Sequence, residues 1–336
     1  MTFSKDALRI DPATVAADIE KALREEVLGN LRRKGAVVAV SGGVDSAVAV
    51  SLAARAFGPE KVLGLILPER EVEKEGERLG KDLLAGLGVR WLREDLTAAL
   101  EGLGCYRRRD EAVCRVVGEF AEGWTSRIVL GHNPLECEGF NIFFLEVFSP
   151  DGAEALRRRL PVREYLEIVA ATNMKQRSRM IMQYYHAEGL QYAVVGTHNR
   201  TEYDLGFMVR HGDIGVDVHP LAGLFKVQIY ELAAYLGIPE AIIARAPSSG
   251  TFPAPQTEQE FFFSLPFELL DPLLYAEAAG IGVEEATAVL GLPLEGCKRV
   301  YRDIESKRRF SQHMRRAPFV LKAWNNLNGD RLHGEV

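Results

Sequence analysis

The stretch that decides the fold is AVVAVSGGVDS, residues 36–46. Residues 36–40 are a short, continuous apolar run of β-favouring side chains, which is typical of a buried parallel strand. Two glycines follow, and residues 46–57 have the pattern of a helix. A strand, a glycine turn and a helix in this order bring free backbone N–H groups and the positive end of a helix dipole together. We therefore predict an anion-binding turn at residues 41–46.

Outward from this turn, strand and helix patterns alternate. The further elements predicted from apolar periodicity are helices at 12–31, 72–87 and 162–186, and strands at 62–67, 89–92 and 192–196. Such alternation gives right-handed crossovers and a parallel sheet. The predicted fold class is α/β, a Rossmann-like, doubly wound parallel sheet with helices on both faces.

Composition narrows the class of protein. The chain has 336 residues, 47% of them hydrophobic, so it can bury a large core. Its formal net charge of -6 argues against a surface devoted to nucleic acid or to an anionic membrane. The first residues lack the apolar core of a signal peptide, and no run approaches the roughly 18 apolar residues of a membrane span. These features predict a cytoplasmic protein with no membrane or nucleic-acid partner.

The cysteines show no metal or redox signature. No CxxC pair occurs, and no histidine stands at zinc-ligand spacing from any of Cys105, Cys114, Cys137 and Cys297. We predict reduced, mostly structural thiols. A nucleophilic thiol at Cys105 or Cys137 stays open, although neither has a local signature.

The glycine turn matches neither GxxxxGK[ST] nor GxGxxG. Its glycines allow the backbone to approach a phosphate, and its serines add hydroxyl donors. The predicted ATP contacts in the turn are Ser41, Gly42, Gly43, Val44 and Ser46, and Asp45 would help to hold Mg²⁺. The alternative is a plain turn with a serine cap. The turn resembles the SGGxDS loop of the ATP pyrophosphatase (PP-loop) superfamily, whose members cleave ATP between the α and β phosphates and transfer AMP.

Five downstream segments resemble the NAD synthetase family, of the ammonia-dependent type, within that superfamily. They fit NxxxRxRM, VGTxxxxE, GDxxxD, PL and KxQ[VI], and lie in this order at residues 173–180, 195–202, 212–217, 220–221 and 226–229. Each segment is weak alone, and the order makes them specific. The resemblance implies an adenine nucleotide alpha hydrolase-like fold.

The resemblance also implies roles for individual residues. Asp45, Lys226 and Asp213 would be catalytic, and Asp45 and Glu202 would hold Mg²⁺. Outside the turn, the implied ATP contacts are Arg177, Thr197 and Ser248, and the implied contacts with the acid substrate are Asp213, Asp217 and Lys226. Arg177 and Arg179 stand two residues apart on one helix, so only one is expected to reach the nucleotide, and the family motif favours Arg177. The alternative for Lys226 and Asp213 is an ordinary surface ion pair.

Three units are predicted along the chain. Residues 1–35 form an N-terminal helical segment, residues 36–275 form the family-like domain with a helical insertion at about 97–161, and residues 276–336 form a C-terminal helical extension. The insertion departs from the family pattern, and so does the region of residues 249–267, where an acidic pair is broken. Both departures leave the acid substrate open.

The predicted function is an ATP-dependent ligase that adenylates a carboxylate and aminates it with ammonia, releasing AMP and pyrophosphate. The first-choice acid is nicotinic acid adenine dinucleotide, which gives NAD, and the cofactors are ATP and Mg²⁺. The resemblance further implies a homodimer and ammonia that is free or supplied by a separate glutaminase. The alternatives are amidation of another acid, an RNA-modifying adenylating enzyme and a catalytically dead nucleotide binder. An RNA-modifying enzyme would be expected to have an added basic domain, and the sequence shows none. A dead binder would be expected to have lost Asp45, Glu202 or Lys226, and all three are present.

Overall fold

The computed structural model describes residues 3–131, 133–136, 142–248 and 250–319. Cys137 and Ser249, on which predictions fall, lie outside these ranges, as do residues 320–336 of the predicted C-terminal extension. No helix in the described ranges is long and apolar enough to cross a membrane.

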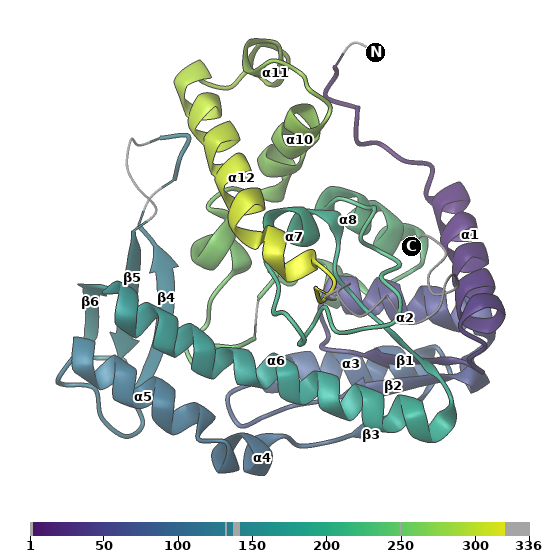
Figure 1. Cartoon of the computed structure of the whole chain (residues 1–336), viewed down its shortest axis with the longest axis horizontal. Helices are drawn as coiled ribbons and strands as arrows, with labels where there is room; N and C mark the ends of the chain where they lie inside the picture. Colours follow the sequence, from purple (N-terminus) through teal and green to yellow (C-terminus); the bar gives the residue numbers. More distant parts are fainter. Residues whose placement is uncertain (1–2, 132, 137–141, 249, 320–336) are drawn as a thin grey trace, which may run out of the picture.

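A four-stranded parallel sheet lies at the centre of the fold (Figure 1). Its strands are β1 (Ala36–Ala39), β2 (Val62–Ile66), β3 (Arg90–Arg93) and β7 (Ala193–Val195), in the order β3-β2-β1-β7. Val38 of β1 pairs with Gly64 of β2 and with Val195 of β7. The predicted parallel sheet is confirmed.

Helices cover both faces of this sheet, as predicted. The helices on one face pack against Val38 and its neighbours; they are α1 (Pro12–Leu23), continued by η1 (Arg24–Asn30), α2 (Val44–Phe57), α3 (Lys74–Gly86), α8 (Lys226–Tyr235) and α9 (Glu240–Ile243). The helices on the other face pack against Val37; they are α4 (Thr97–Gly102), α5 (Cys105–Val116) and α6 (Val162–Leu190). Because side chains alternate along a strand, β1 contributes to both cores. A short helix, η2 (Pro59–Lys61), leads into β2.

The expected helical insertion at 97–161 is wrong for its second half. After α4 and α5 come β4 (Thr125–Leu130), β5 (Phe143–Phe148) and β6 (Ala155–Arg159), which form an antiparallel sheet in the order β4-β5-β6. Alternate residues such as Ile128 and Leu145 face a core shared with Ile168 of α6. The strands are short and separated by Gly and Pro breaks, which hid their period of two.

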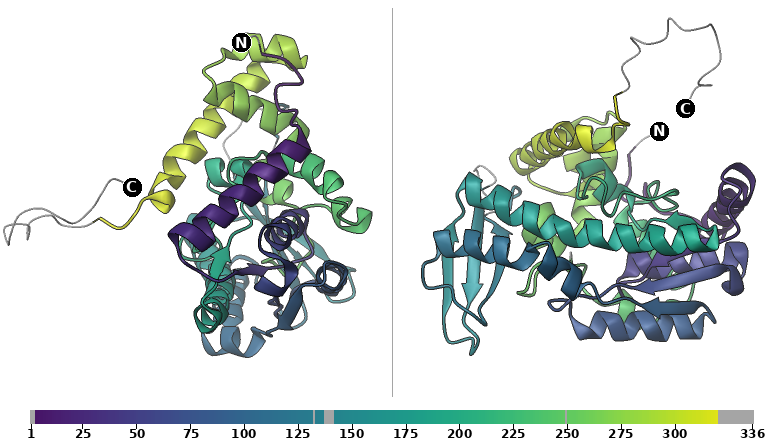
Figure 2. Two further views of the ribbon diagram at one scale, coloured as in Figure 1. Left: turned by 90° about the vertical axis from the view of Figure 1, so that its right-hand side faces the viewer. Right: turned by 60° about the horizontal axis from the view of Figure 1, so that its bottom comes forward.

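The C-terminal helices form a separate layer, clearest in Figure 2, on one side of the α/β core. They are α10 (Phe267–Ala278), α11 (Val283–Leu290) and α12 (Leu294–Arg315), and Phe3 and Leu8 near the N-terminus pack among them. The predicted boundary between 275 and 276 falls inside α10, so it is displaced. The remaining helices, α7 (Arg200–Leu205) and η3 (Gln259–Phe263), lie between this layer and the core.

Candidate active site

The two serines brace the turn between β1 and α2. Ser46 Oγ donates to the Gly43 carbonyl at 2.9 Å and accepts from the Ser41 N–H at 3.2 Å. Ser41 Oγ accepts from the Gly43 N–H at 3.3 Å. Helix α2 begins at Val44, directly after the glycines. The turn therefore presents the start of a 14-residue helix at the carboxyl end of the sheet, where ligands of such folds bind.

Gly42 cannot be replaced by a residue with a side chain. Its φ is +79°, and a Cβ built there would lie 2.1 Å from the carbonyl oxygen of Gly76 in α3. A side chain would meet both the steric penalty of the left-handed region and a backbone clash. The close approach packs the turn directly against the first turn of α3.

Lys226, the first residue of α8, lies in front of the glycine turn among three carboxylates. Its Nζ is 2.6 Å from Asp45 Oδ2, 3.4 Å from Glu202 Oε1 and 3.7 Å from Glu258 Oε2. The Lys226 side chain is 0% exposed. The alternative of a surface ion pair is thus wrong for Lys226, because a fully buried ammonium must be held by specific partners.

Asn199 joins two of these carboxylates. Its Nδ2 donates to Asp45 Oδ1 at 2.9 Å and to Glu202 Oε1 at 2.8 Å. Its Oδ1 accepts the Glu202 N–H at 3.0 Å, so Asn199 is also the N-cap of α7. Of the VGTxxxxE segment at residues 195–202, the sequence analysis singled out Thr197 and Glu202 but not Asn199. The Asn-x-x-Glu spacing of a helix cap was the signal that could have found Asn199.

The charges around Lys226 do not balance, since three carboxylates face one ammonium. Burial, and next the charge of Asp45, raises the pKa of Glu202 well above its usual value. Burial also raises the pKa of Glu258. For Lys226, burial opposes the charge, but Asp45, Glu258 and Glu202 outweigh it and hold the pKa well above its usual value. Lys226 is therefore held as a cation, and the crowded carboxyl groups around it offer oxygen ligands to a further cation, whose charge would favour their ionised forms.

The backbone of Lys226 is fixed by a buried pair on two other helices. Its N–H donates to Thr201 Oγ1 at 3.2 Å, and Thr201 donates to Asp271 Oδ1 at 2.6 Å. The other oxygen of Asp271 accepts the Val227 N–H at 2.9 Å. Burial raises the pKa of Asp271 to about 7. Asp271 of α10 thus ties the start of α8 to α7, which carries Glu202.

Glu258 is a residue that sequence reasoning missed. It lies just before η3 in the region interpreted as a broken acidic pair, and it is buried. The sequence TEQE at 257–260 held a signal, because Thr257 and Glu260 have the spacing of a capping box. Glu260 Oε2 accepts from the Thr257 N–H at 2.9 Å and from its hydroxyl at 3.0 Å. This pair fixes the backbone on both sides of Glu258.

Of the two arginines of the NxxxRxRM segment, Arg179 is the one placed at the end of the sheet. Its Nε donates to the carbonyl of Leu67, just after β2, at 3.3 Å. Arg177 is exposed and donates to the Arg210 carbonyl at 3.3 Å. The two arginines point in different directions, as expected, and the choice of Arg177 as the nucleotide contact stays a prediction.

Asp213 lies apart from the Lys226 cluster. Its Oδ1 accepts the Val209 N–H at 2.7 Å and is 3.7 Å from His198 Nε2. Burial raises the pKa of Asp213, and burial followed by the charge of His198 lowers the pKa of His219 to about 4. His219 is therefore neutral near neutral pH, and the two histidines are close in space although distant in sequence.

The other predicted contacts are less central. Asp217 accepts the Val194 N–H at 2.8 Å and the Tyr184 hydroxyl at 3.1 Å, so it braces β7. Thr197 lies half-buried two residues after β7. Ser248 Oγ accepts the Gly250 N–H at 3.3 Å within its own loop. No hydrogen bond between described residues joins Ser248 to the glycine turn.

Two cysteines fit the structural reading. Cys105 is buried and donates to the Ala171 carbonyl at 3.1 Å, and Cys297 is buried in the C-terminal layer. Burial raises the pKa of both thiols. A raised pKa disfavours the thiolate, which argues against Cys105 as a nucleophile.

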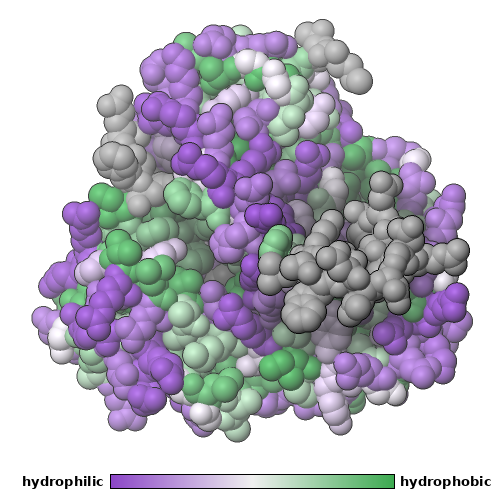
Figure 3. Space-filling model, in the orientation of Figure 1, coloured by the Kyte–Doolittle hydropathy of each residue, from purple (hydrophilic) through white to green (hydrophobic). Residues whose placement is uncertain are grey.

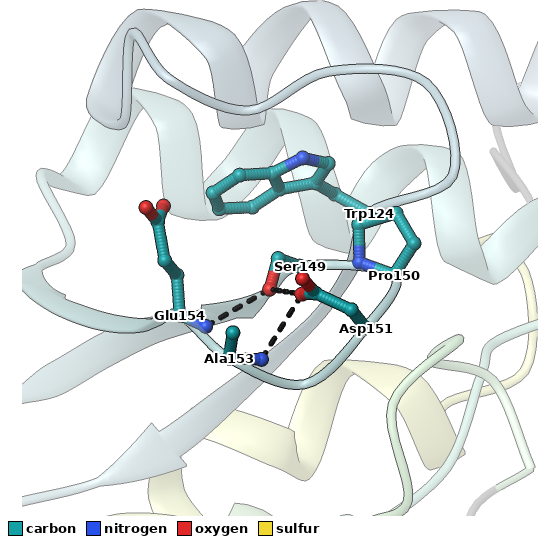
Figure 4. A pocket seen from close by; sticks show the side chains of 6 residues that line it. All are labelled: Trp124, Ser149, Pro150, Asp151, Ala153 and Glu154. Atoms are coloured by element: carbon teal, nitrogen blue, oxygen red, sulfur yellow. Dashed lines mark hydrogen bonds between the residues drawn. The ribbon is translucent and has the colours of Figure 1, made fainter.

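A surface cavity of about 380 Å³ lies elsewhere, at the turn after β5 (Figure 4). Trp124 lies over the turn, in which Asp151 Oδ1 accepts from the Ser149 hydroxyl at 2.6 Å and from the Ala153 N–H at 3.0 Å. These bonds are internal to the turn. None of the residues that line the cavity belongs to the cluster around Lys226.

Comparison with known proteins places this site in a family. The sequence model of the NAD synthase family matches residues 15–112 and 153–318. A similar protein, the NH(3)-dependent NAD(+) synthetase of Mesorhizobium japonicum, is 45% identical over 313 residues, which are 93% of this chain and 98% of that protein.

Two solved structures have the same fold. One is the NH3-dependent NAD synthetase of Campylobacter jejuni, with a TM-score of 0.62 and 19% identity over 94% of this chain and all of that chain. The other is an NMN synthetase of Francisella tularensis, with a TM-score of 0.61 and 21% identity over 94% of this chain and all of that chain. The family match and the 45% identical relative go beyond fold, and the chain belongs to the NAD synthase family.

Proposed function

We propose that this chain is an ammonia-dependent NAD synthetase, which adenylates nicotinic acid adenine dinucleotide and converts it to NAD. The observation that carries the proposal is the buried ammonium of Lys226, 2.6 Å from Asp45 in the glycine turn. A cation beside a phosphate-binding turn is what transfer from a triphosphate requires. The name of the 45% identical relative supports the choice of acid and of ammonia.

In this mechanism the triphosphate lies over the N–H groups at the start of α2, and Lys226 faces its outer phosphates. The substrate carboxylate attacks the α-phosphorus, and the bond to the bridging oxygen breaks, so pyrophosphate leaves. Lys226 stabilises the charge that develops on that leaving group. Ammonia then attacks the carbonyl carbon, AMP leaves with the carboxylate oxygen, and a proton lost from nitrogen passes to solvent. The chain positions the two substrates and neutralises the charge of the phosphates, and no covalent intermediate with the protein is required.

Asp45 and Glu202 are the proposed ligands of Mg²⁺. Both offer oxygens beside Asn199, and the pocket has more carboxylates than ammonium groups. Among the described residues no group of three or more His, Cys, Asp or Glu side chains is arranged as a metal site. Mg²⁺ is usually bound through one or two carboxylates together with phosphates and water. The ion would supply charge neutralisation for the phosphates.

The identity of the acid rests on the sequence relatives. A protein named NMN synthetase shares the fold at 21% identity. The fold alone therefore does not decide whether the acid is nicotinic acid adenine dinucleotide or nicotinic acid mononucleotide. An RNA-modifying role is disfavoured by the formal charge of -6. A dead nucleotide binder is disfavoured because Asp45, Glu202 and Lys226 form one cluster.

The test is pyrophosphate release from ATP, Mg²⁺ and ammonia with a panel of acids. Nicotinic acid adenine dinucleotide is expected to give the highest kcat/KM and NAD as product. Release with nicotinic acid mononucleotide alone would keep the chemistry and reject the proposed acid. Release with neither acid would reject the proposed function.

A homodimer through α6 is the proposed assembly. The outward face of this long helix carries Val162, Leu166, Ile181 and Tyr185, of which Leu166 is 59% and Tyr185 66% exposed. Hydrophobic side chains gather on the lower left of the face shown in Figure 3, over the part of the molecule that α6 crosses in Figure 1. Arg177 lies on the same stripe of the helix. An apolar stripe on one helix suits a two-fold contact, in which each copy uses the same surface.

The double variant Ile181→Asp/Tyr185→Asp is therefore expected to be monomeric, because each copy would bury two carboxylates against the two of its partner at the two-fold contact. Size-exclusion chromatography with light scattering measures the mass directly. Leu28→Asp, at another exposed apolar residue outside α6, is the matched control and should keep the dimer mass. A double variant with the same mass as the parent would place the contact elsewhere.

The remaining assignments rest on the proposed substrates. The proposed nitrogen source is ammonia, either free or from a separate glutaminase, because the 45% identical relative is named as NH(3)-dependent. ATP and a dinucleotide acid as substrates support the predicted cytoplasmic location.

A further inference from the structure

In the antiparallel sheet of β4, β5 and β6, the edge strand β4 is covered by a segment that comes from the active site. The sequence model of the family skips residues 113–152, which include β4 and β5. In the sheet order β4-β5-β6, β4 is an edge strand. Unpaired edges attract another extended segment. Here the segment of residues 250–260, which contains Glu258, lies along that edge.

Four contacts hold the segment to β4. The Ala254 N–H donates to the Ser126 carbonyl at 3.3 Å, and Gln256 Nε2 donates to the Ile128 carbonyl. Arg127 Nη1 donates to the Pro255 carbonyl at 2.7 Å and is 3.4 Å from Glu260 Oε1. Phe252 and Phe261 of the segment pack edge to face at 5.2 Å in the core beneath the sheet. One of these contacts joins two backbone groups, and the others use the side chains of Gln256, Arg127 and Glu260.

A second anchor holds the beginning of the segment from α6. Lys175 is fully buried, and its Nζ donates to the Thr251 carbonyl at 2.8 Å, to Glu69 at 3.0 Å and to Glu71 at 2.6 Å. Tyr106 of α5 donates to Glu69 at 2.8 Å. The segment is therefore held at two places before it reaches Glu258, by Lys175 at Thr251 and by β4 at residues 254–256.

Glu258 itself has few contacts of its own. Its N–H donates to the Pro247 carbonyl at 3.0 Å. Its Oε2 is buried with no hydrogen-bond partner among the described residues, and Lys226 Nζ is 3.7 Å away. Because no hydrogen bond between described residues fixes Oε2, the position of Glu258 in front of Lys226 depends in part on the backbone of the segment, which contacts β4.

We propose that β4 acts as a clamp that positions Glu258 against Lys226, and that Arg127 is the positioning residue of this clamp. Glu258 in turn holds the Lys226 ammonium where the leaving pyrophosphate needs it. The inference rests on the proposed function for the chemical step. The clamp would let a segment that departs from the family pattern still complete the site.

A double-mutant cycle on the full chain tests the clamp. Arg127→Ala is expected to lower kcat for pyrophosphate release about tenfold, as loss of a charge-assisted hydrogen bond does. Glu258→Gln is expected to lower it by about tenfold or more, and the double variant no further than Glu258→Gln alone, since both act on one contact. KM for ATP should change less than kcat in all three.

The matched control is Arg157→Ala on the same sheet. Arg157 Nε is 3.8 Å from Glu146, which Arg127 also contacts, and no bond ties Arg157 to the segment. It should keep the parent kcat, and Arg127→Lys should recover most of it. Additive losses in the cycle, or equal losses in Arg127→Ala and Arg157→Ala, would overturn the clamp.

Hydrogen exchange of the full chain without substrates separates this inference from the proposed function. The amides of Ala254, Gln256, Thr257 and Glu258 are expected to exchange at least about tenfold faster in Arg127→Ala than in Arg157→Ala, because opening of the segment no longer breaks the Arg127 bond. Unchanged exchange would overturn the clamp even in an active enzyme. An inactive parent chain with faster exchange in the variant would reject the function and retain the clamp.

Discussion

Replacing Lys226 with methionine is expected to lower the rate of pyrophosphate release at least about a thousandfold, as removal of a preorganised cation from phosphoryl-type transfer does. Methionine keeps much of the length and volume of the side chain. It removes the one ammonium that faces Asp45, Glu202 and Glu258 in the buried cluster. The measurement is single-turnover pyrophosphate release at saturating ATP.

The same substitution should also affect stability, because it leaves buried carboxylates without their cation. Breaking such a pair costs about 3–5 kcal/mol. Lys307→Met is the control, since Lys307 lies 2.7 Å from Asp303 in α12 and donates to the Phe262 carbonyl at 2.8 Å, outside the cluster. It should lose stability and keep the parent rate in the folded enzyme. Equal rates for Lys226→Met and the parent would remove Lys226 from the chemistry.

Gly42→Ala is expected to abolish pyrophosphate release and to destabilise the fold. The alanine Cβ would meet the Gly76 carbonyl oxygen at 2.1 Å, and the φ of +79° is unfavourable for any L side chain. The turn must then move away from α3 and no longer present the start of α2 to a phosphate. The loss of stability should exceed the roughly 1–2 kcal/mol of left-handed strain alone. Chemical denaturation and the pyrophosphate assay measure the two effects.

Gly237→Ala isolates the strain from the clash. Gly237 has a φ of +70°, and no atom lies within 4 Å of a Cβ built there. This variant should lose only about 1–2 kcal/mol and keep the parent activity. If Gly42→Ala behaved like Gly237→Ala in both assays, the turn would not need its close approach to α3.

The central fold was predictable because its signals are local. Buried parallel strands such as 36–40 are continuous apolar runs, and the glycines after them mark the turn. The strands β4 and β5 were missed because Gly and Pro breaks surround them and their buried residues are interrupted by partly exposed ones, unlike the continuous buried run of β2. The boundary near residue 275 was misplaced because α10 continues the apolar pattern across it.

The site was predictable where a residue follows a strand or begins a helix. Asp45, Glu202 and Lys226 were predicted as site residues, and the structure brings them together. Glu258 comes from a loop more than 30 residues beyond Lys226, so the capping-box spacing of Thr257 and Glu260 could indicate the start of a helix there but not that Glu258 lies beside Lys226. Arg177 and Arg179 differ only in the side of α6 they occupy, which depends on the packing of the whole helix.

The most direct test of the central claim is the fate of the carboxylate oxygens. Nicotinic acid adenine dinucleotide labelled with oxygen-18 in its carboxylate is incubated with the chain, ATP, Mg²⁺ and ammonia, and the nucleotide products are examined by mass spectrometry. Attack of the carboxylate on the α-phosphorus predicts AMP carrying one labelled oxygen, together with unlabelled pyrophosphate. ADP as the nucleotide product, with the label in inorganic phosphate, would contradict adenylation.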